Sequence, residues 1–304
     1  MGPREGGLAV SRVNTGTDLE LGTWTVTEDA VRQYLEAVGD TQPAYFDCKL
    51  APPVALAAWT LGALLKKLGL PSGAIHSLQE LESCGGVHFG EEVRATAYPG
   101  RPRRRGNLEF LTTGYTLRNR NGEQLLTGKS TVLIVSPSEE EAAGDGSLQT
   151  SAAPSGNSGI STADGKRPQS SLPVITRTIT QSQLNDYSQA SGDDNPLHLD
   201  PAFAASTQFG GIIAHGMLTL AFVGEMMVAA YGRPWLETGL LNAKFRGAAY
   251  LGDRLETWGQ VSREEARPNG RSVECSVNVR NSRSGEEIIN GTAAVLIKPP
   301  RPSL

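Results

Sequence analysis

The sequence predicts an α+β protein in which one type of domain occurs twice along a single chain of 304 residues. Three observations predict this. Segments early in the two halves match each other, each half places an apolar helix before several strands, and a stretch rich in Ser, Gly and Ala separates the halves. A buried helix followed by consecutive antiparallel strands packs on one face of their sheet.

The repeat is clearest around two Gly-Asp turns. In VRQYLEAVGDTQPAY and LNDYSQASGDDNPLH, Tyr34 matches Tyr187 and Asp40 matches Asp193 at one constant offset. Late in each half, an Arg-Asn pair and a Val-Leu-Ile run recur in the same order. Several matches in one order indicate a duplicated domain.

Each half follows the same order of elements. Hydrophobic periodicity predicts helices at 28–37, 54–65, 181–190 and 216–230. Alternating apolar residues predict strands at 93–98, 108–117, 125–135, 254–261, 273–280 and 288–297. We therefore expect a first domain over 1–136, a flexible linker over 137–172 with almost no large apolar residue, and a second domain over 173–304.

Composition excludes several classes of function. A net charge of -4 argues against a nucleic-acid binder. No apolar run reaches the roughly 18 residues that span a bilayer, and the start of the sequence has no secretory signal pattern. Three widely spaced cysteines form no zinc or disulfide pattern. We expect a cytoplasmic protein without a membrane partner.

The segment SGDDNPLHLD in the second half holds the densest group of reactive side chains. Gly192 and Pro196 force a turn, which allows Asp193, Asn195 and His198 to converge. An imidazole beside a carboxylate can act as a general acid–base pair near neutral pH. The alternative is a capped turn with a packed histidine, and the spacing alone favours that alternative.

A second segment, IIAHGM, comes directly before an apolar helix. Gly216 would place an unpaired backbone N–H at the helix N-terminus, where no side chain blocks a docking oxyanion. The alternative is that Gly216 only allows close packing and that His215 is a satisfied polar residue.

Together, the residues SGDDNPLHLDPAFAASTQFGGIIAHGML resemble the signature of the MaoC-like (R)-specific hydratases and dehydratases, a family with the hotdog fold. FRGAAYLGDRL, further along, is similar to the strand entry of that family. The resemblance covers roughly 175–297, and the first half is similar to the degenerate copy of double-hotdog members. It implies an α+β double hotdog.

The resemblance also implies the chemistry. Asp193 and His198 would position a water, add it across the α,β double bond of an enoyl thioester and return a proton to Cα. Gly216 would bind the thioester oxygen as enolate charge develops. A preorganised oxyanion donor contributes on the order of 3 kcal/mol. Neither a metal nor a cofactor is expected.

The expected partner is an acyl thioester of coenzyme A or of acyl carrier protein. Asn195, His215 and Met217 are assigned to substrate binding, with Asn195 also supporting the loop. Some relatives act on short branched or dicarboxylic acyl groups such as mesaconyl-CoA, and others act on straight chains. The direction of the reaction and the assembly, including a homodimer, stay open.

The first half departs from this pattern because Tyr45 stands where the second half has His198. Asp40 remains, but without an imidazole it cannot complete the pair. We therefore expect one active site per chain, with the first half forming a wall of the acyl tunnel. Two other functions were weighed. Glu225 on the apolar helix would suit a hotdog thioesterase, and a non-catalytic acyl-thioester binding module would need no Asp–His pair.

Overall fold

The computed structural model describes residues 16–70, 73–135 and 170–299. Within these residues, no helix is both long enough and apolar enough to cross a membrane. The expected linker lies outside the described residues except for its end. There, the Leu172 N–H donates to the Gly259 carbonyl at 2.9 Å, and the Val261 N–H donates to the Ser170 carbonyl at 3.0 Å.

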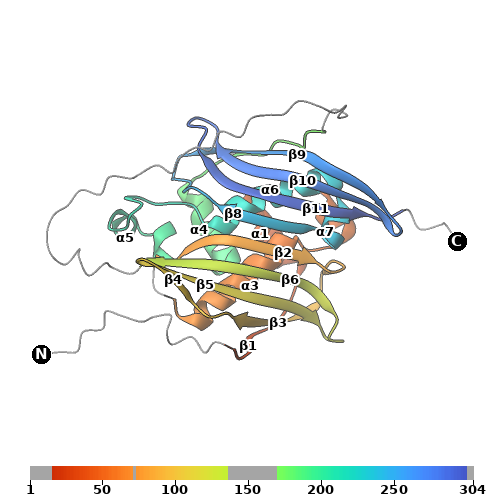
Figure 1. Cartoon of the computed structure of the whole chain (residues 1–304), viewed down its shortest axis with the longest axis horizontal. Coiled ribbons are helices and arrows are strands. Elements are labelled where there is room, and N and C mark those ends of the chain that lie inside the picture. Colours follow the sequence, from red (N-terminus) through yellow and green to blue (C-terminus); the bar gives the residue numbers. More distant parts are fainter. Residues whose placement is uncertain (1–15, 71–72, 136–169, 300–304) are drawn as a thin grey trace, which may run out of the picture.

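One antiparallel sheet of eleven strands runs through both halves (Figure 1). The strands of the first half are β1 (Leu19–Thr25), β2 (Ile75–Ser83), β3 (Glu92–Pro99), β4 (Arg103–Arg105), β5 (Leu108–Asn119) and β6 (Gln124–Val135). Those of the second half are β7 (Thr176–Thr178), β8 (Leu240–Phe245), β9 (Arg254–Arg267), β10 (Gly270–Asn281) and β11 (Glu287–Ile297).

The order of the strands shows the duplication. The sheet reads β1-β3-β5-β6-β2-β8-β11-β10-β9-β7, with β4 added on β5, so the second half mirrors the first. The two halves join where β2 pairs with β8, from Leu78 opposite Lys244 to Glu82 opposite Leu240. The predicted α+β class and duplicated domain are confirmed.

The helices come in matching sets. The first half has α1 (Glu28–Val38), α2 (Ala44–Cys48) and α3 (Pro53–Leu68). The second has α4 (Gln181–Ser191), a short 3-10 turn η2 (Pro196–His198), α5 (Pro201–Ala205), α6 (Gly216–Tyr231) and α7 (Arg233–Thr238). All four predicted helices and six predicted strands are present, with ends shifted by a few residues.

The two long helices, α3 and α6, form the centre of the core. Pro53 begins α3 at a position where its missing N–H costs no hydrogen bond. Every residue of α6 from Met217 to Val228 is buried, as expected for a helix that is apolar on all sides. The two helices pack on each other, α1 packs on α4, and the repeat-related Tyr34 and Tyr187 place their ring centroids 5.8 Å apart.

Candidate active site

The loop after α4 carries the predicted acid–base residues. Helix α4 ends because Gly192 takes the left-handed conformation, with φ of 76°. After Asp193, the chain enters the 3-10 turn η2. Asn195 caps this turn, because its Oδ1 accepts a hydrogen bond from the Leu197 N–H at 3.1 Å. This turn brings His198 back toward Asp193, as the sequence predicts.

The His198 imidazole has a defined orientation. Its Nδ1 lies 2.8 Å from the Ile213 carbonyl oxygen, so Nδ1 must donate and Nε2 is left with a lone pair in the neutral ring. Burial lowers the pKa of His198 below its usual 6.5, and the Asp193 charge and the Ile213 carbonyl oppose that shift. The residue is therefore a neutral base at physiological pH.

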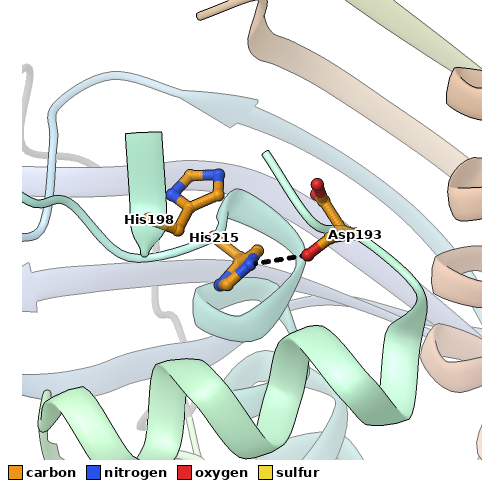
Figure 2. Close-up of side chains that lie close together, drawn as sticks. All are labelled: Asp193, His198 and His215. Carbon is orange, nitrogen blue, oxygen red and sulfur yellow. Dashed lines mark hydrogen bonds between the residues drawn. The ribbon is translucent and has the colours of Figure 1, made fainter. Parts of the chain in front are cut away.

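Asp193 completes the pair. One carboxylate oxygen of Asp193, one nitrogen of His198 and one nitrogen of His215 all lie within 4.8 Å of one another. Figure 2 shows the Asp193 carboxylate and the His198 ring above His215. A water that bonds two such groups at about 2.8 Å each bridges roughly 4.6 Å, so one water fits between carboxylate and imidazole.

His215 lies beneath this pair. It is fully buried, its Nε2 is 3.2 Å from the Asp193 carbonyl oxygen, and its ring centroid is 3.9 Å from that of His198 (Figure 2). Burial holds its pKa well below 6.5, with the nearby His198 adding to the shift. His215 is absent from the residues that line the cavity, and it contacts the Asp193 backbone and the His198 ring. Its assignment to substrate binding stays a prediction, and its burial indicates that it would act through these two residues.

These three side chains are also of types that bind divalent metals. His198 Nδ1 and His215 Nε2 already face backbone carbonyl oxygens, which leaves one free nitrogen on each ring. An acid–base pair of Asp193 and His198 would use the same carboxylate and imidazole without a metal. The expectation that the site works without a metal stays a prediction.

Gly216 is the first residue of α6, where backbone N–H groups have no partner within the helix. None of the hydrogen bonds among the described residues uses the Gly216 N–H. A Cβ at this position would lie 3.1 Å from the Phe245 ring, so glycine also makes room for that ring. The predicted oxyanion donor is thus placed at a helix N-terminus, beside a closely packed aromatic ring.

A cavity of about 640 Å³ lies over these residues. Asp193, Asn195, His198, Gly216 and Met217 line it, so five of the six predicted site residues face one space. Further residues of the second half complete that side of the wall, and the first half supplies another part of it from α3, the residue Leu70 after it, β2 and β6: Leu61, Leu65, Lys66, Leu70, Ile75, His76, Val132 and Leu133. The site therefore lies between the halves.

Asn195 ties that wall to the loop. Its Nδ2 donates to the Ala74 carbonyl and its Oδ1 accepts from the Gly73 N–H, both at 3.3 Å. Sequence reasoning expects a wall from the first half but identifies none of the residues that form it, His76 among them. No local motif marks them, because only the pairing of β2 with β8 brings them to the cavity.

The counterpart site in the first half is closed. Tyr45 donates its hydroxyl to Asp40 Oδ2 at 2.7 Å, which uses the carboxylate that would otherwise face a ligand. Burial raises the pKa of Asp40. The space beside the pair measures about 10 Å³, at the lower limit for a single water. The expectation of one active site per chain agrees with this geometry.

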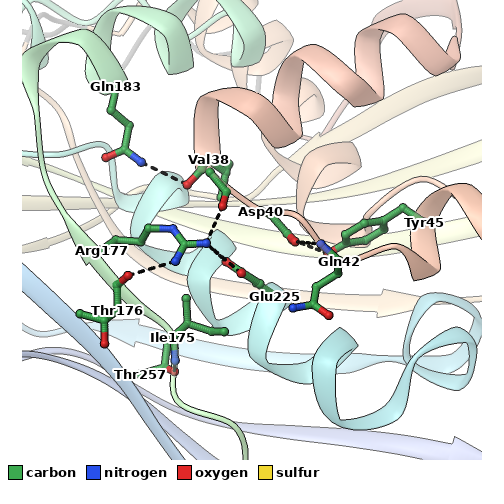
Figure 3. A network of polar contacts seen from close by, with 11 residues as sticks. Val38, Asp40, Gln42, Tyr45, Ile175, Thr176, Arg177, Gln183, Glu225 and Thr257 are labelled. Atoms are coloured by element: carbon green, nitrogen blue, oxygen red, sulfur yellow. Dashed lines mark hydrogen bonds and ion pairs between the residues drawn. The ribbon is translucent and has the colours of Figure 1, made fainter.

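Glu225, the acid of the thioesterase alternative, is engaged elsewhere. Arg177 donates to both of its carboxylate oxygens at 2.8 Å and also binds the Gly39 carbonyl (Figure 3). Burial and the charge of Asp40 outweigh this ion pair and raise the pKa of Glu225 to about 7. Because Glu225 is not part of the described cavity wall, it is not placed to act on a substrate there.

Comparison with known proteins agrees with this arrangement. Residues 165–283 match the MaoC like domain, and residues 14–127 match the FAS1-like dehydratase domain region. The chain is 31% identical over 112 residues to 3-hydroxyacyl-thioester dehydratase Z of Mycobacterium tuberculosis, covering 34% of this chain and 74% of that protein. It is 27% identical over 128 residues to 3-hydroxybutyryl-CoA dehydratase of Methylorubrum extorquens, covering 42% of this chain and 78% of that protein.

The fold has solved counterparts. A Mycobacterium tuberculosis protein described as having a double hotdog fold superposes with a TM-score of 0.66 at 12% identity, over 96% of this chain and 98% of that one. The class is therefore a double-hotdog protein with one open site between its halves. The chain belongs to the MaoC-like dehydratase family, whose members are hydro-lyases of acyl thioesters.

Proposed function

We propose that this protein is an (R)-specific hydro-lyase that interconverts trans-2-enoyl and 3-hydroxyacyl thioesters, with Asp193 and His198 as its acid–base pair. The observation that carries the proposal is the convergence, on one cavity, of a buried neutral imidazole, a carboxylate and a free helix N-terminal N–H. Hydration of an enoyl thioester needs these three groups: a base for water, an acid for Cα and a donor for the enolate oxygen.

In the hydration direction, the substrate carbonyl oxygen accepts a hydrogen bond from the Gly216 N–H. A water held between Asp193 and His198 loses a proton to this pair as its oxygen bonds to Cβ. The double-bond electrons move to Cα and the thioester oxygen, and the pair returns a proton to Cα. Both acid–base groups lie on one loop, so water and proton reach the same face of the planar enoyl group.

Membership of the MaoC-like dehydratase family supports the (R) hand, and the spacing of the residues does not determine it. The acyl group is proposed to be short and branched or dicarboxylic, of the kind found in mesaconyl-CoA, carried on coenzyme A or acyl carrier protein. The part of the cavity wall that comes from the first half is largely apolar. This supports an acyl group bound inside the cavity and a carrier that stays outside it.

His198→Ala and Asp193→Asn are each expected to lower kcat for crotonyl-CoA hydration by about 10² or more, in the range of general acid–base catalysis. Asp40→Asn serves as the matched control, since its carboxylate bonds Tyr45 in the closed site. Near-normal kcat in either active-site variant would refute the pair. Chiral chromatography of the hydrolysed product should give the (R)-3-hydroxy acid, and an excess of the (S)-isomer would refute the stereochemical assignment.

A further inference from the structure

Five basic side chains lie together at the cavity end of the first half. Lys66 and Lys67 belong to the last turn of α3, and Lys66 lines the cavity. Arg103 and Arg105 belong to β4, and Arg101 lies two residues before that strand. All five side chains are exposed, and we call this group the basic rim. In a chain whose net charge is -4, the rim concentrates five positive charges at one edge.

The pairing of the strands places β4 close to the cavity. Arg103 pairs with Phe110 of β5, which pairs with Leu133 of β6. Leu133 pairs in turn with Ile75 of β2, and these two residues line the cavity. Neighbouring strands lie about 4.8 Å apart, so Arg103 stands roughly 10 to 14 Å from the cavity wall. Leu68 at the end of α3 packs against the same part of β5 and β6, which brings the two lysines to this edge.

The rim has no carboxylate partner among the described residues. Ten ion pairs join other arginine and lysine side chains to carboxylates, and none of them includes a rim residue. Arg104 is not counted in the rim, because it lies opposite Glu109 and donates to the Gly106 carbonyl. Like charges held at one edge repel each other, so the rim favours a negatively charged partner.

The second half gives the cavity a different charge. Asp194 and Glu286 line the cavity from that half. An acidic partner is therefore attracted to the first-half side of the cavity and repelled from the second-half side. Such a pattern of charge fixes the orientation in which a partner docks.

The extent of the rim favours a protein over a small molecule. The phosphates of coenzyme A are grouped around a single ribose, and a few cations next to the cavity would suffice for them. The rim continues from Lys66 at the cavity to a strand roughly 10 to 14 Å from the cavity wall. A protein contact covers several hundred Å² on each partner, even in the weak and transient class, and so matches this extent.

We propose that the basic rim docks the acidic surface of an acyl carrier protein, whose thioester then enters the cavity past Lys66. This inference rests on the proposed function and narrows its two possible carriers to one. It also gives the first half, which has lost its own Asp–His pair, a role in recognising the substrate as well as in shaping the cavity.

The test presents one acyl group on three carriers: crotonyl-loaded acyl carrier protein, crotonyl-CoA and crotonyl-pantetheine, which has no charge. In Arg103→Gln/Arg105→Gln, kcat/KM for the protein-bound substrate should fall by about 3- to 30-fold, since exposed ion pairs each contribute up to about a fivefold effect. The loss should appear in KM, because neither residue touches the reacting atoms. The values for the other two substrates should change less than about twofold.

Arg118→Gln/Arg120→Gln is the matched control. It removes the same charge at the opposite end of β5 and should leave kcat/KM for all three substrates unchanged. Both double variants should keep the Tm of the unmodified protein, because exposed substitutions of this kind change stability little. Raising the salt from about 0.05 to 0.3 M should lower kcat/KM for the protein-bound substrate, and should do so less in Arg103→Gln/Arg105→Gln.

Three outcomes would overturn the proposal. An unchanged kcat/KM for the protein-bound substrate in Arg103→Gln/Arg105→Gln would show that the rim takes no part in docking. An equal loss with crotonyl-CoA would assign the rim to the phosphates of coenzyme A. An equal loss in the control variant would mean that only the net charge of the protein matters.

Binding without turnover separates this proposal from the proposed function. Calorimetry with butyryl-loaded acyl carrier protein and with butyryl-CoA measures recognition of the carrier alone. If no enoyl thioester is hydrated, the proposed function fails, while binding of the loaded carrier protein that Arg103→Gln/Arg105→Gln weakens would still support the rim. If hydration proceeds but binding of the carrier protein does not depend on the rim, only the inference fails.

Discussion

At the scale of single residues, the His198 imidazole acts as a base only in its neutral form. Its pKa lies below 6.5 because burial disfavours the imidazolium ion. The protonated ring has no lone pair for water, so activity requires a pH above this pKa. The hydration rate should therefore be level near neutral pH and should fall about tenfold per pH unit on the acid side.

This prediction is checked by measuring kcat/KM for crotonyl-CoA from pH 4.5 to 8, with a return to pH 7 to confirm that the protein survives. The Asp193 charge raises the pKa of His198. In Asp193→Asn, the acid limb of the pH profile of the residual activity should therefore lie at a lower pH. A limb that moves to higher pH in this variant would contradict the assigned charge interaction.

Gly216 allows its N–H to be removed without breaking the helix. Proline is well tolerated at the first position of a helix, so Gly216→Pro deletes the donor and keeps α6. Gly216→Ala is the matched variant, because it adds a Cβ against Phe245 but keeps the N–H.

We expect kcat of Gly216→Pro to lie about 10²-fold below that of Gly216→Ala, as for other lost oxyanion donors. Circular dichroism should show that the helix content of both variants is unchanged. Equal kcat values in the two variants would mean that Gly216 serves packing only.

Sequence reasoning reached most of the site because Asp193, Asn195, His198 and Gly216 belong to two motifs close together in the chain. Local turns, caps and the helix start shape each motif, and the bond from His198 Nδ1 to the Ile213 carbonyl joins the two. His76 could not be found in this way. It is far from both motifs in the sequence, and only the pairing of β2 with β8 brings it to the cavity wall.

At the scale of elements, the two strands that unite the halves, β2 and β8, are among the five that went unpredicted. In β2, IHSLQELES, the leucines at 78 and 81 are three apart and the intervening residues are good helix formers, so the local pattern does not indicate a strand. β8 has only six residues. Each becomes a strand because the other pairs with it, a tertiary effect that overrides local propensity.

The contact between α3 and the end of α4 positions the catalytic loop. A Cβ at Gly62 would lie 2.6 Å from the carbonyl oxygen of Ser191, two residues before Asp193. Alanine usually stabilises a helix interior by about 1 kcal/mol relative to glycine. At this position, however, the added Cβ would force α3 or α4 to move. Gly62→Ala should therefore lower kcat/KM for crotonyl-CoA by roughly tenfold or more, since small misplacements of catalytic groups reduce rates strongly.

The matched control is Gly224→Ala on α6, whose Cβ would meet the Val54 side chain at 3.0 Å, beside the closed site. This variant should change Tm more than kcat/KM. If Gly224→Ala reduced activity as much as Gly62→Ala, general loosening between the halves, and not displacement of the loop, would explain both effects.

At the scale of the whole molecule, duplication has produced two interfaces between helices and sheet but one usable cavity. The open site takes its acid–base pair from the second half and its inner wall from the first. The closed site contains the Asp40–Tyr45 hydrogen bond (Figure 3). Beside it, Arg177 pairs with Glu225 of its own half and donates to the Gly39 carbonyl of the first half. One copy thus supplies the chemistry while the other supplies shape.

The last prediction concerns whether the halves need a covalent connection. β2 and β8 pair over Leu78–Glu82, α3 packs on α6 and α1 on α4, and the partly buried Arg177 donates to the Gly39 carbonyl of the other half. Each half alone would leave a strand edge and an apolar helix face open to water, an arrangement that favours association. We propose domain limits at 1–136 and 173–304, and expect a chain cut within 137–172 to stay associated and active.

A specific protease site inserted between residues 150 and 151 provides the test. After complete cleavage, the two fragments should elute together in size-exclusion chromatography and keep most of the kcat/KM for crotonyl-CoA. The same insertion left uncut is the control for the added residues. Because the inner wall of the site comes from the first half, a purified second half should have little activity until the first half is added. Fragments that separate as stable monomers, or a second half that is fully active alone, would contradict an active site shared between the halves.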